Sequence, residues 1–210
     1  MSEGEETVLS AVREALEGLD SRAPLPDYGD EVAVSEARLE GGSLWEIFSS
    51  NLEAVGGRAM TRVEDLAALL VQWDCRRGYC DPKLKEEVGE PLERAGFALV
   101  YEYERENYND YAFGVTRASG AIAESGTLIL NDFDTSDRLA ALSPWVHVAV
   151  LPGVGLIHRS IPAALAALGE CPNVVWATGP SKTADVEGIL IEGVHGPGEE
   201  ICLCLEAGRR

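Results

Sequence analysis

A carboxylate and two hydroxyl groups lie at a glycine turn in the segment Glu124-Ser125-Gly126-Thr127. Apolar runs flank this segment on both sides, which predicts a tight hairpin or a strand–turn–strand. A turn lifts side chains out of a sheet, so a carboxylate there can act as a general base or a nucleophile. We therefore take Glu124 as a candidate catalytic residue and Ser125, Gly126 and Thr127 as candidate ligand-binding residues. The alternative is a solvated acid beside ordinary turn residues.

A second polar loop begins at Gly179 and directly follows a segment expected to be a strand. A glycine loop that leaves a strand and enters a helix presents free backbone N–H groups, and a lysine beside them would complete an anion site. Lys182, one of three lysines in the chain, is the candidate catalytic cation. The candidate ligand-binding residues of this loop are Gly179, Pro180, Ser181, Thr183, Asp185 and Glu187. The alternative is that Ser181 caps a helix whose N-terminal dipole Asp185 and Glu187 complement.

An imidazole lies between glycines in the segment Gly193-Val194-His195-Gly196-Pro197. Small neighbours let a ligand approach the ring, and histidine titrates near neutral pH. His195 is therefore the third candidate catalytic residue, and Gly196 is a candidate ligand-binding residue. His147 lies within an apolar strand and is expected to be a core or sheet-edge residue. Three histidines without metal-ligand spacing predict no metal site in this chain.

The elements that must position these loops alternate between helices and short apolar strands. This alternation predicts an α/β fold with a largely parallel sheet flanked by helices. The expected helices cover Thr7–Leu19, Ser43–Val55, Thr61–Trp73, Asp81–Gly96 and Ile161–Leu168, the third beginning with a Thr61/Glu64 capping box. The expected strands cover Arg58–Met60, Phe97–Tyr103, Gly120–Glu124, Thr127–Asn131, Trp145–Leu151, Asn173–Ala177 and Ile201–Leu205.

Charge is the unusual feature of the composition. The 210 residues carry a formal net charge of −19, which repels phosphate backbones and anionic lipids, so neither nucleic acid nor a membrane surface is expected as a partner. No apolar stretch is long enough to span a bilayer, and the acidic start is unlike a signal peptide, so we expect a cytoplasmic protein. The five cysteines have spacings that match no zinc or iron–sulfur motif, and we expect buried thiols.

The chain divides into an expected N-terminal helix and acidic arm, residues 1–40, and an α/β domain, residues 41–210. Residues 1–110 hold 25 acidic and 11 basic residues, whereas residues 111–210 hold 11 and 6. The acidity therefore belongs mostly to the first half of the chain. We interpret the acidic front as a face that meets a partner, and the more neutral second half as compatible with a small anionic ligand.

Taken together, the motifs resemble the LUD domain family, of the lactate utilisation protein C type. The matching segments are Gly114-Val115-Thr116, Ala121 to Leu128, Pro144 to Val148, Gly179 to Glu187 and Gly193 to Pro197. The resemblance implies a Rossmann-like domain similar to the NagB/RpiA/CoA-transferase fold. It also implies a cluster-free component that supports oxidation of L-lactate to pyruvate, with iron–sulfur clusters in partner proteins and no cofactor in this chain.

Three functions follow from these observations. The first is a subunit that binds a small carboxylate or other small anion and docks on iron–sulfur proteins. The second is a CoA-transferase-like or isomerase-like enzyme that uses Glu124 with Lys182 and His195, and the third is a ligand-sensing regulatory module. The resemblance favours convergence of the three loops. Ligands of α/β folds bind at the carboxyl ends of parallel strands, and two of the three loops directly follow predicted strands, so we expect them to meet there.

Overall fold

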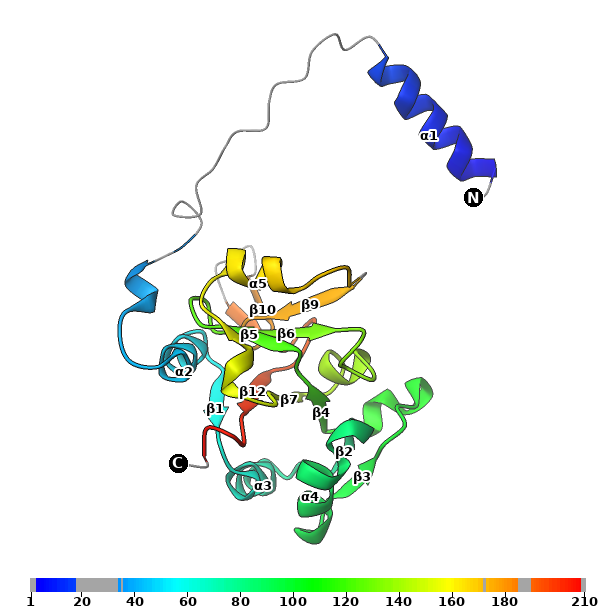
Figure 1. The fold of residues 1–210 in the computed structure, drawn as a ribbon. Coiled ribbons are helices and arrows are strands. Elements are labelled where there is room, and N and C mark those ends of the chain that lie inside the picture. The colour runs from blue at the N-terminus through cyan, green and yellow to red at the C-terminus, as the bar shows by residue number, and fades with distance from the viewer. Residues whose placement is uncertain (1–2, 18–33, 35, 172, 185–189, 209–210) are drawn as a thin grey trace.

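Six parallel strands form the central sheet of the computed structural model, which describes residues 3–17, 34, 36–171, 173–184 and 190–208 (Figure 1). The strands lie in the order β1–β12–β7–β4–β2–β3. Their bounds are β1 (Arg58–Met60), β12 (Glu199–Leu203), β7 (Val146–Val150), β4 (Phe113–Arg117), β2 (Arg77–Cys80) and β3 (Ala98–Val100). The prediction of an α/β fold with a mostly parallel sheet is confirmed.

Helices cover one face of this sheet. α3 (Val63–Gln72) and α4 (Glu90–Arg94) pack on it, and the 3₁₀ helix η3 (Pro82–Leu84) and the π-helical turn η4 (Lys85–Gly89) lead into α4. Side chains alternate along β7, so its valines point to these helices and His147 points to the opposite face. The predicted capping box of α3 is wrong. Arg62 is the N-cap without a side-chain hydrogen bond, and its Nε lies 3.4 Å from the Glu64 carboxylate that the box would need.

A second sheet and α2 (Leu44–Ala54) cover the other face. The second sheet has the order β8–β5–β6–β9, and α5 (Ile161–Ala167) packs on its outer side (Figure 1). The strand bounds are β8 (Ile157–His158), β5 (Gly120–Ile122), β6 (Thr127–Asn131) and β9 (Val174–Ala177). The predicted hairpin around Ser125 is confirmed, because β5 and β6 pair antiparallel. Ser43 and Glu46 form a capping box that starts α2.

Several elements differ from expectation. α1 (Glu3–Leu16) begins and ends earlier than predicted, and its described side chains are exposed. Strand β3 ends at Val100, because the aromatic residues that follow join a cluster in which Tyr103 contacts the rings of Tyr79 and Tyr111. No helix of the described residues combines the length and apolar character needed to cross a bilayer. The division of the chain at residue 40 stays a prediction.

Two central strands, β2 and β4, were not predicted. The connections that follow these neighbouring strands run to opposite sides of the sheet. β2 leads to β3 on one side of the sheet, whereas β4 leads through the second sheet to β7 on the other. A crevice opens outside the carboxyl ends of parallel strands where neighbouring connections diverge in this way, and ligands of open α/β sheets bind there. The carboxyl ends of β2 and β4 are therefore the place where this fold favours a ligand.

Candidate functional site

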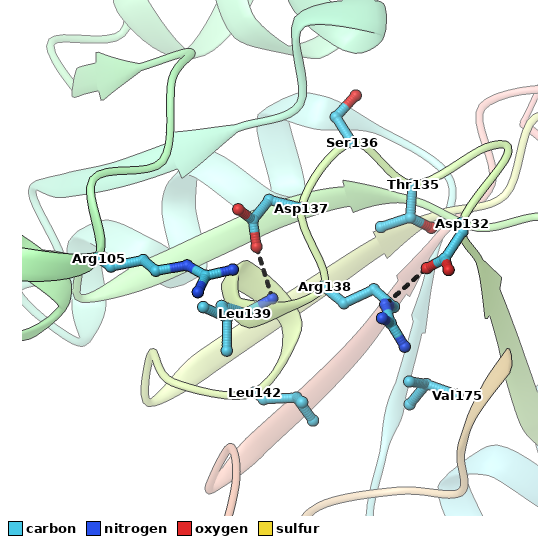
Figure 2. Close-up of a pocket in the computed structure, with 9 residues that line it drawn as sticks. All are labelled: Arg105, Asp132, Thr135, Ser136, Asp137, Arg138, Leu139, Leu142 and Val175. Atoms are coloured by element: carbon cyan, nitrogen blue, oxygen red, sulfur yellow. Dashed lines mark hydrogen bonds and ion pairs between the residues drawn. The ribbon is translucent and has the colours of Figure 1, made fainter. Parts of the chain in front are cut away.

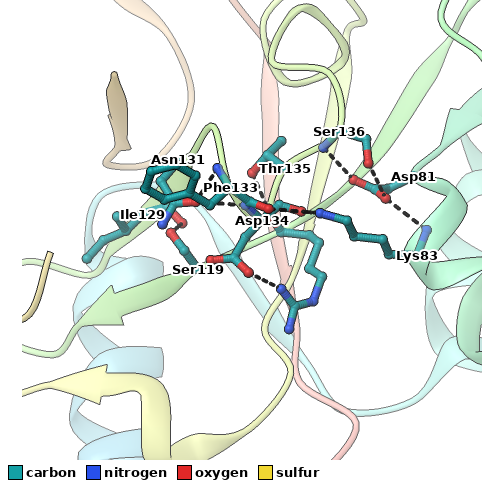
Figure 3. A network of polar contacts seen from close by, with 10 residues as sticks. Asp81, Lys83, Ser119, Ile129, Asn131, Phe133, Asp134, Thr135 and Ser136 are labelled. Atoms are coloured by element: carbon teal, nitrogen blue, oxygen red, sulfur yellow. Dashed lines mark hydrogen bonds and ion pairs between the residues drawn. The ribbon is translucent and has the colours of Figure 1, made fainter. Parts of the chain in front are cut away.

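A loop formed by residues 132–138 closes over the carboxyl ends of β2 and β4, and Asp81 holds it there (Figure 3). Asp81 directly follows β2 and is fully buried. Its Oδ2 accepts a hydrogen bond from the Ser136 N–H at 2.8 Å, and its Oδ1 accepts from the Ser136 hydroxyl at 2.9 Å. Oδ1 also accepts from the Lys83 N–H at 2.9 Å, which caps η3. One carboxylate thus joins the end of β2 to the loop.

Further polar contacts fix the same loop (Figure 3). The Lys83 ammonium donates to the carbonyl oxygens of Phe133 and Asp134 at 3.0 and 2.9 Å. Arg117, the last residue of β4, forms an ion pair with the Asp134 carboxylate. Arg117 also accepts a 2.8 Å hydrogen bond at its carbonyl from the Thr135 hydroxyl. The loop is therefore anchored to both strands, so the side chains that it carries are held in place.

This loop forms one wall of a pocket of about 530 Å³, which we name the β2–β4 pocket (Figure 2). It is lined by Arg105, Asp132, Thr135, Ser136, Asp137, Arg138, Leu139, Leu142 and Val175. The volume lies within the range usual for small-molecule sites. Two guanidinium groups, two carboxylates and three aliphatic side chains suit a ligand that has an anionic group, a polar group and a small apolar part.

The charged groups of the β2–β4 pocket differ in how far they are already engaged. The Arg138 Nε lies 2.7 Å from the Asp132 carboxylate, so this pair neutralises itself. Asp137 accepts a 2.8 Å hydrogen bond from the Leu139 N–H at Oδ1. Arg105 extends toward Asp137 in Figure 2, and within the described residues its guanidinium has no ion-pair partner. Arg105 and Asp137 therefore offer a cation and an anion to one ligand.

Two ionisable side chains of β2, Tyr79 and Cys80, stay protonated near neutral pH. Burial raises the pKa of Tyr79, and the nearby charges of Asp81 and Asp137 raise it further. Burial, together with Asp81, raises the pKa of the Cys80 thiol to about 12. A nucleophilic cysteine needs the thiolate form. Cys80 is therefore a buried core residue and not a nucleophile near neutral pH.

The turn at Glu124 rests on α2, away from the β2–β4 pocket. Glu124 is 6% exposed, and the Asn51 amide donates a 2.8 Å hydrogen bond to the Ala123 carbonyl. Gly126 has a φ of +65°, and a Cβ there would lie 2.3 Å from the Leu52 nitrogen, so only glycine fits. The expectation of an exposed carboxylate is wrong, because α2 covers the turn.

A chain of hydroxyl groups leads from this turn to the Gly179 loop. The Ser125 hydroxyl lies 2.7 Å from that of Thr127, which lies 2.7 Å from that of Thr178. The next residue, Gly179, has a φ of +69°, and a Cβ there would lie 2.7 Å from the Val55 carbonyl oxygen. The first two motifs are therefore adjacent in space.

The Gly179 loop does not enter a helix, which corrects the basis of the predicted anion site. Lys182 and Thr183 belong to β10 (Lys182–Ala184), a strand that pairs with β11 (Leu190–Glu192). Pairing with β11 satisfies the backbone groups that a helix N-terminus would have left free. Asp185 and Glu187 lie outside the described residues, and Pro180 is buried.

Lys182 is engaged in a structural contact. Its ammonium donates a 2.9 Å hydrogen bond to the Val55 carbonyl at the C-cap of α2 and lies 3.6 Å from the Glu192 carboxylate. A cation at a helix C-terminus interacts favourably with the helix dipole. The ammonium is therefore already paired, which makes it a weaker candidate for an anion site than Arg105.

The His195 loop packs on the Gly179 loop through backbone contacts. The Ser181 N–H donates to the Pro197 carbonyl at 2.8 Å, and the Gly193 N–H donates to the Ser181 carbonyl at 2.9 Å. A Cβ at Gly196 would lie 3.2 Å from the Ser181 Cβ. His195 itself is exposed. The three predicted loops thus come together, although the contacts between them join backbone and hydroxyl groups and not the side chains of Glu124, Lys182 and His195.

The predicted loops gather at the amino-terminal edge of the central sheet. Gly57 immediately precedes β1, and Gly198 immediately precedes β12. The strands that lead into the loops, β5, β9 and β11, belong to the two smaller sheets and not to the parallel one. The expectation that the loops meet at the carboxyl ends of parallel strands is therefore wrong. The β2–β4 pocket lies at the opposite edge.

The sequence interpretation missed Asp81, Arg105, Asp137 and Arg138 as site residues. A signal for two of them was present, because a dense run of charged and hydroxyl residues, 132–138, directly follows the predicted strand Thr127–Asn131. Polar residues after a strand are typical of sites in α/β folds. Asp81 was read only as the start of a helix, which is also correct.

A buried polar network crosses the middle of the central sheet. The His147 Nε2 lies 2.8 Å from the Thr116 hydroxyl, and its Nδ1 lies 2.7 and 2.9 Å from the two Glu200 oxygens. Thr116 and His147 are fully buried and Glu200 is 2% exposed. Burial raises the pKa of Glu200, and His147 opposes that rise. The order hydroxyl–imidazole–carboxylate matches a catalytic triad, but all three side chains are buried, so we interpret the network as structural.

Comparisons with known proteins point to one family. The model of the LUD domain matches residues 46–205. A lactate utilization protein C from Shouchella clausii is 36% identical over 170 residues, which cover 76% of this chain and 68% of the relative. A protein of the same name from Exiguobacterium is 40% identical over 91 residues, only 40% of its length. A solved DUF162 family structure from Deinococcus radiodurans shares the fold, with a TM-score of 0.53 at 17% identity over 81% of this chain and 98% of that chain.

Proposed function

This chain belongs to the LUD domain family, and on that premise we propose that it acts in lactate utilisation as a component that binds L-lactate or pyruvate. Curated relatives named lactate utilization protein C support the role. Within the proposal, iron–sulfur partner proteins accept the electrons. The five cysteines of this chain are free thiols without cluster-binding spacing, which supports assigning the clusters to the partners.

One observation carries the ligand assignment: the β2–β4 pocket presents the Arg105 guanidinium and the Asp137 carboxylate to the same space (Figure 2). A 2-hydroxy acid has the complementary groups. Its carboxylate accepts two parallel hydrogen bonds from a guanidinium, and its hydroxyl donates to a carboxylate. Leu139 and Leu142 provide an apolar wall for a methyl group. A small 2-hydroxy acid therefore satisfies each kind of group in the pocket.

The same residues suit the reaction. Oxidation of lactate to pyruvate releases two protons and two electrons and converts the C2–OH bond to a carbonyl. In this proposal Asp137 takes the hydroxyl proton as a general base, while Arg105 holds the carboxylate in position. Oxidised clusters of the iron–sulfur partner would accept the two electrons, and the C2 proton would be released to water. This chain thus supplies binding, orientation and one proton acceptor.

The second interpretation, catalysis by Glu124 with Lys182 and His195, has less support. Glu124 is buried in a turn that packs on α2, and the Lys182 ammonium contacts the Val55 carbonyl and the Glu192 carboxylate. A ligand at Lys182 would first have to displace these contacts. The regulatory interpretation has no particular observation in its favour.

Calorimetric titration of the full chain with L-lactate and pyruvate tests the proposal. We expect Arg105→Met to weaken binding of both acids by about tenfold or more, because it removes a charge-assisted contact. Asp137→Asn should weaken L-lactate more than pyruvate, since only L-lactate has a hydroxyl to donate. Lys182→Met is the matched control and should leave both affinities within about twofold. Equal loss in the control, or none in Arg105→Met, would contradict the proposal.

A further inference from the structure

α1 carries an apolar stripe that no described residue covers. Val8, Val12 and Leu16 recur every four residues, with Leu9 beside them, and their exposed fractions are 63, 50, 41 and 37%. A helix of 14 residues is marginal alone in water, and most helices gain their stability by burying such a stripe. The stripe is therefore a surface suited to another molecule.

Charge indicates which kind of molecule would bind this stripe. The polar side of α1 carries Glu6 and Glu14, and its Arg13 lies 3.4 Å from Glu6, which neutralises the cation. Residues 1–40 hold 11 acidic and only 3 basic residues, within a chain of net charge −19. A second copy would bring the same excess of negative charge, so repulsion opposes self-association through this arm.

We propose that α1 is a docking helix that binds a different protein, in an apolar groove bordered by lysine and arginine side chains. This is the helix-in-groove mode of recognition, in which residues spaced three and four apart enter the groove. Val8, Val12 and Leu16 enter it, and the net negative charge of residues 1–40 favours a basic border. The proposal uses only α1 and stands whether or not the β2–β4 pocket binds lactate.

Site-specific photo-crosslinking in the native cell tests the contact. The full chain carries benzoylphenylalanine at Val12, on the stripe, or at Ser10, on the opposite side of the helix. We expect the Val12 probe to give one discrete adduct with another protein, and the Ser10 probe to give at most a trace. Mass spectrometry of the adduct should map the crosslink to apolar residues flanked by lysine or arginine. The proposal would be overturned if the Val12 probe gave no adduct or an adduct with a second copy of the chain. It would also be overturned if the crosslinked residues were flanked by acidic side chains, or if the Val12 and Ser10 probes gave equal yields.

The purified partner identified by that adduct then allows a quantitative test. Val12→Gln should weaken binding by about tenfold or more, and the matched Ser10→Gln by less than about twofold. Glu14→Lys, on the same face as Ser10, should weaken binding about twofold to threefold at low salt and flatten its dependence on salt, because it reduces the long-range attraction of the acidic arm, which salt screens. Binding that is indifferent to Val12→Gln, or to salt, would overturn the proposal. The thermal unfolding of all three variants should match the unmodified chain, since α1 is outside the core.

Discussion

Replacing His147 with alanine is expected to lower the free energy of unfolding by about 3–5 kcal/mol, the largest effect of any single substitution considered. The imidazole contacts Glu200 at 2.7 Å and Thr116 at 2.8 Å, and all three side chains are buried between the two sheets. Its removal leaves a carboxylate and a hydroxyl without partners, together with a cavity. Urea denaturation followed by tryptophan fluorescence measures the change.

Two controls separate this network from ordinary contacts. Thr116→Val removes one neutral hydrogen bond and should cost about 1 kcal/mol. Arg62→Ala breaks an exposed ion pair with Glu64 and should cost less than about 0.5 kcal/mol. A loss in His147→Ala no greater than that in Thr116→Val would show that the network contributes little to stability.

The same network makes the free energy of unfolding depend on pH in a direction that can be predicted. Burial raises the pKa of Glu200 in the folded chain above its pKa in the unfolded chain. The contribution of Glu200 to stability is therefore greatest below its unfolded-state pKa, and it is lost as pH rises through its folded-state pKa. The difference in unfolding free energy between the wild type and Glu200→Gln should therefore decrease as pH rises from about 4.5. A difference that increases with pH would contradict the assigned direction.

Asp81→Ala is expected to have the second largest effect, a loss of about 3 kcal/mol in unfolding free energy and of tenfold or more in affinity for lactate. The fully buried carboxylate accepts from the Lys83 N–H and from both the N–H and the hydroxyl of Ser136. Its removal leaves these donors unpaired and frees the loop that carries Asp137 and Arg138. Denaturation and calorimetric titration measure the two losses.

Asp74→Asn is the matched control for charge, because Asp74 is exposed, its carboxylate pairs with Arg76, and asparagine tolerates its φ of +56°. It should change stability by less than about 0.5 kcal/mol and leave ligand affinity unchanged. Asp81→Asn keeps one acceptor oxygen and should fall between the control and Asp81→Ala. If Asp81→Ala lost stability but kept full affinity, the loop would not position the ligand.

Local sequence patterns were sufficient to predict much of the fold. The apolar run around β7, the Ser125-Gly126 turn and the apolar spacing of α2 each encode an element within a few residues, and each of these predicted elements is confirmed. Strands β2 and β4 were missed because Gly78 and Gly114 interrupt their apolar pattern. Both glycines are needed for packing: a Cβ at Gly114 would lie 1.9 Å from the Ala140 carbonyl oxygen.

The candidate site was harder to predict, because its contacts join residues far apart in the chain. Asp81 and Ser136 are 55 residues apart, and Lys182 and Val55 are 127 apart. Nothing near Lys182 in the sequence distinguishes a cation that binds a ligand from one that caps a distant helix. The convergence of the three motif loops was expected, but the edge of the sheet at which they gather depends on strand order, which motifs do not encode.

The most direct test of the proposed ligand site is a crystal structure of the chain with L-lactate or pyruvate at a saturating concentration. We expect density in the β2–β4 pocket, with the carboxylate on Arg105 and the C2 oxygen toward Asp137. Density at the opposite edge, among Glu124, Lys182 and His195, with the β2–β4 pocket empty, would contradict the proposal.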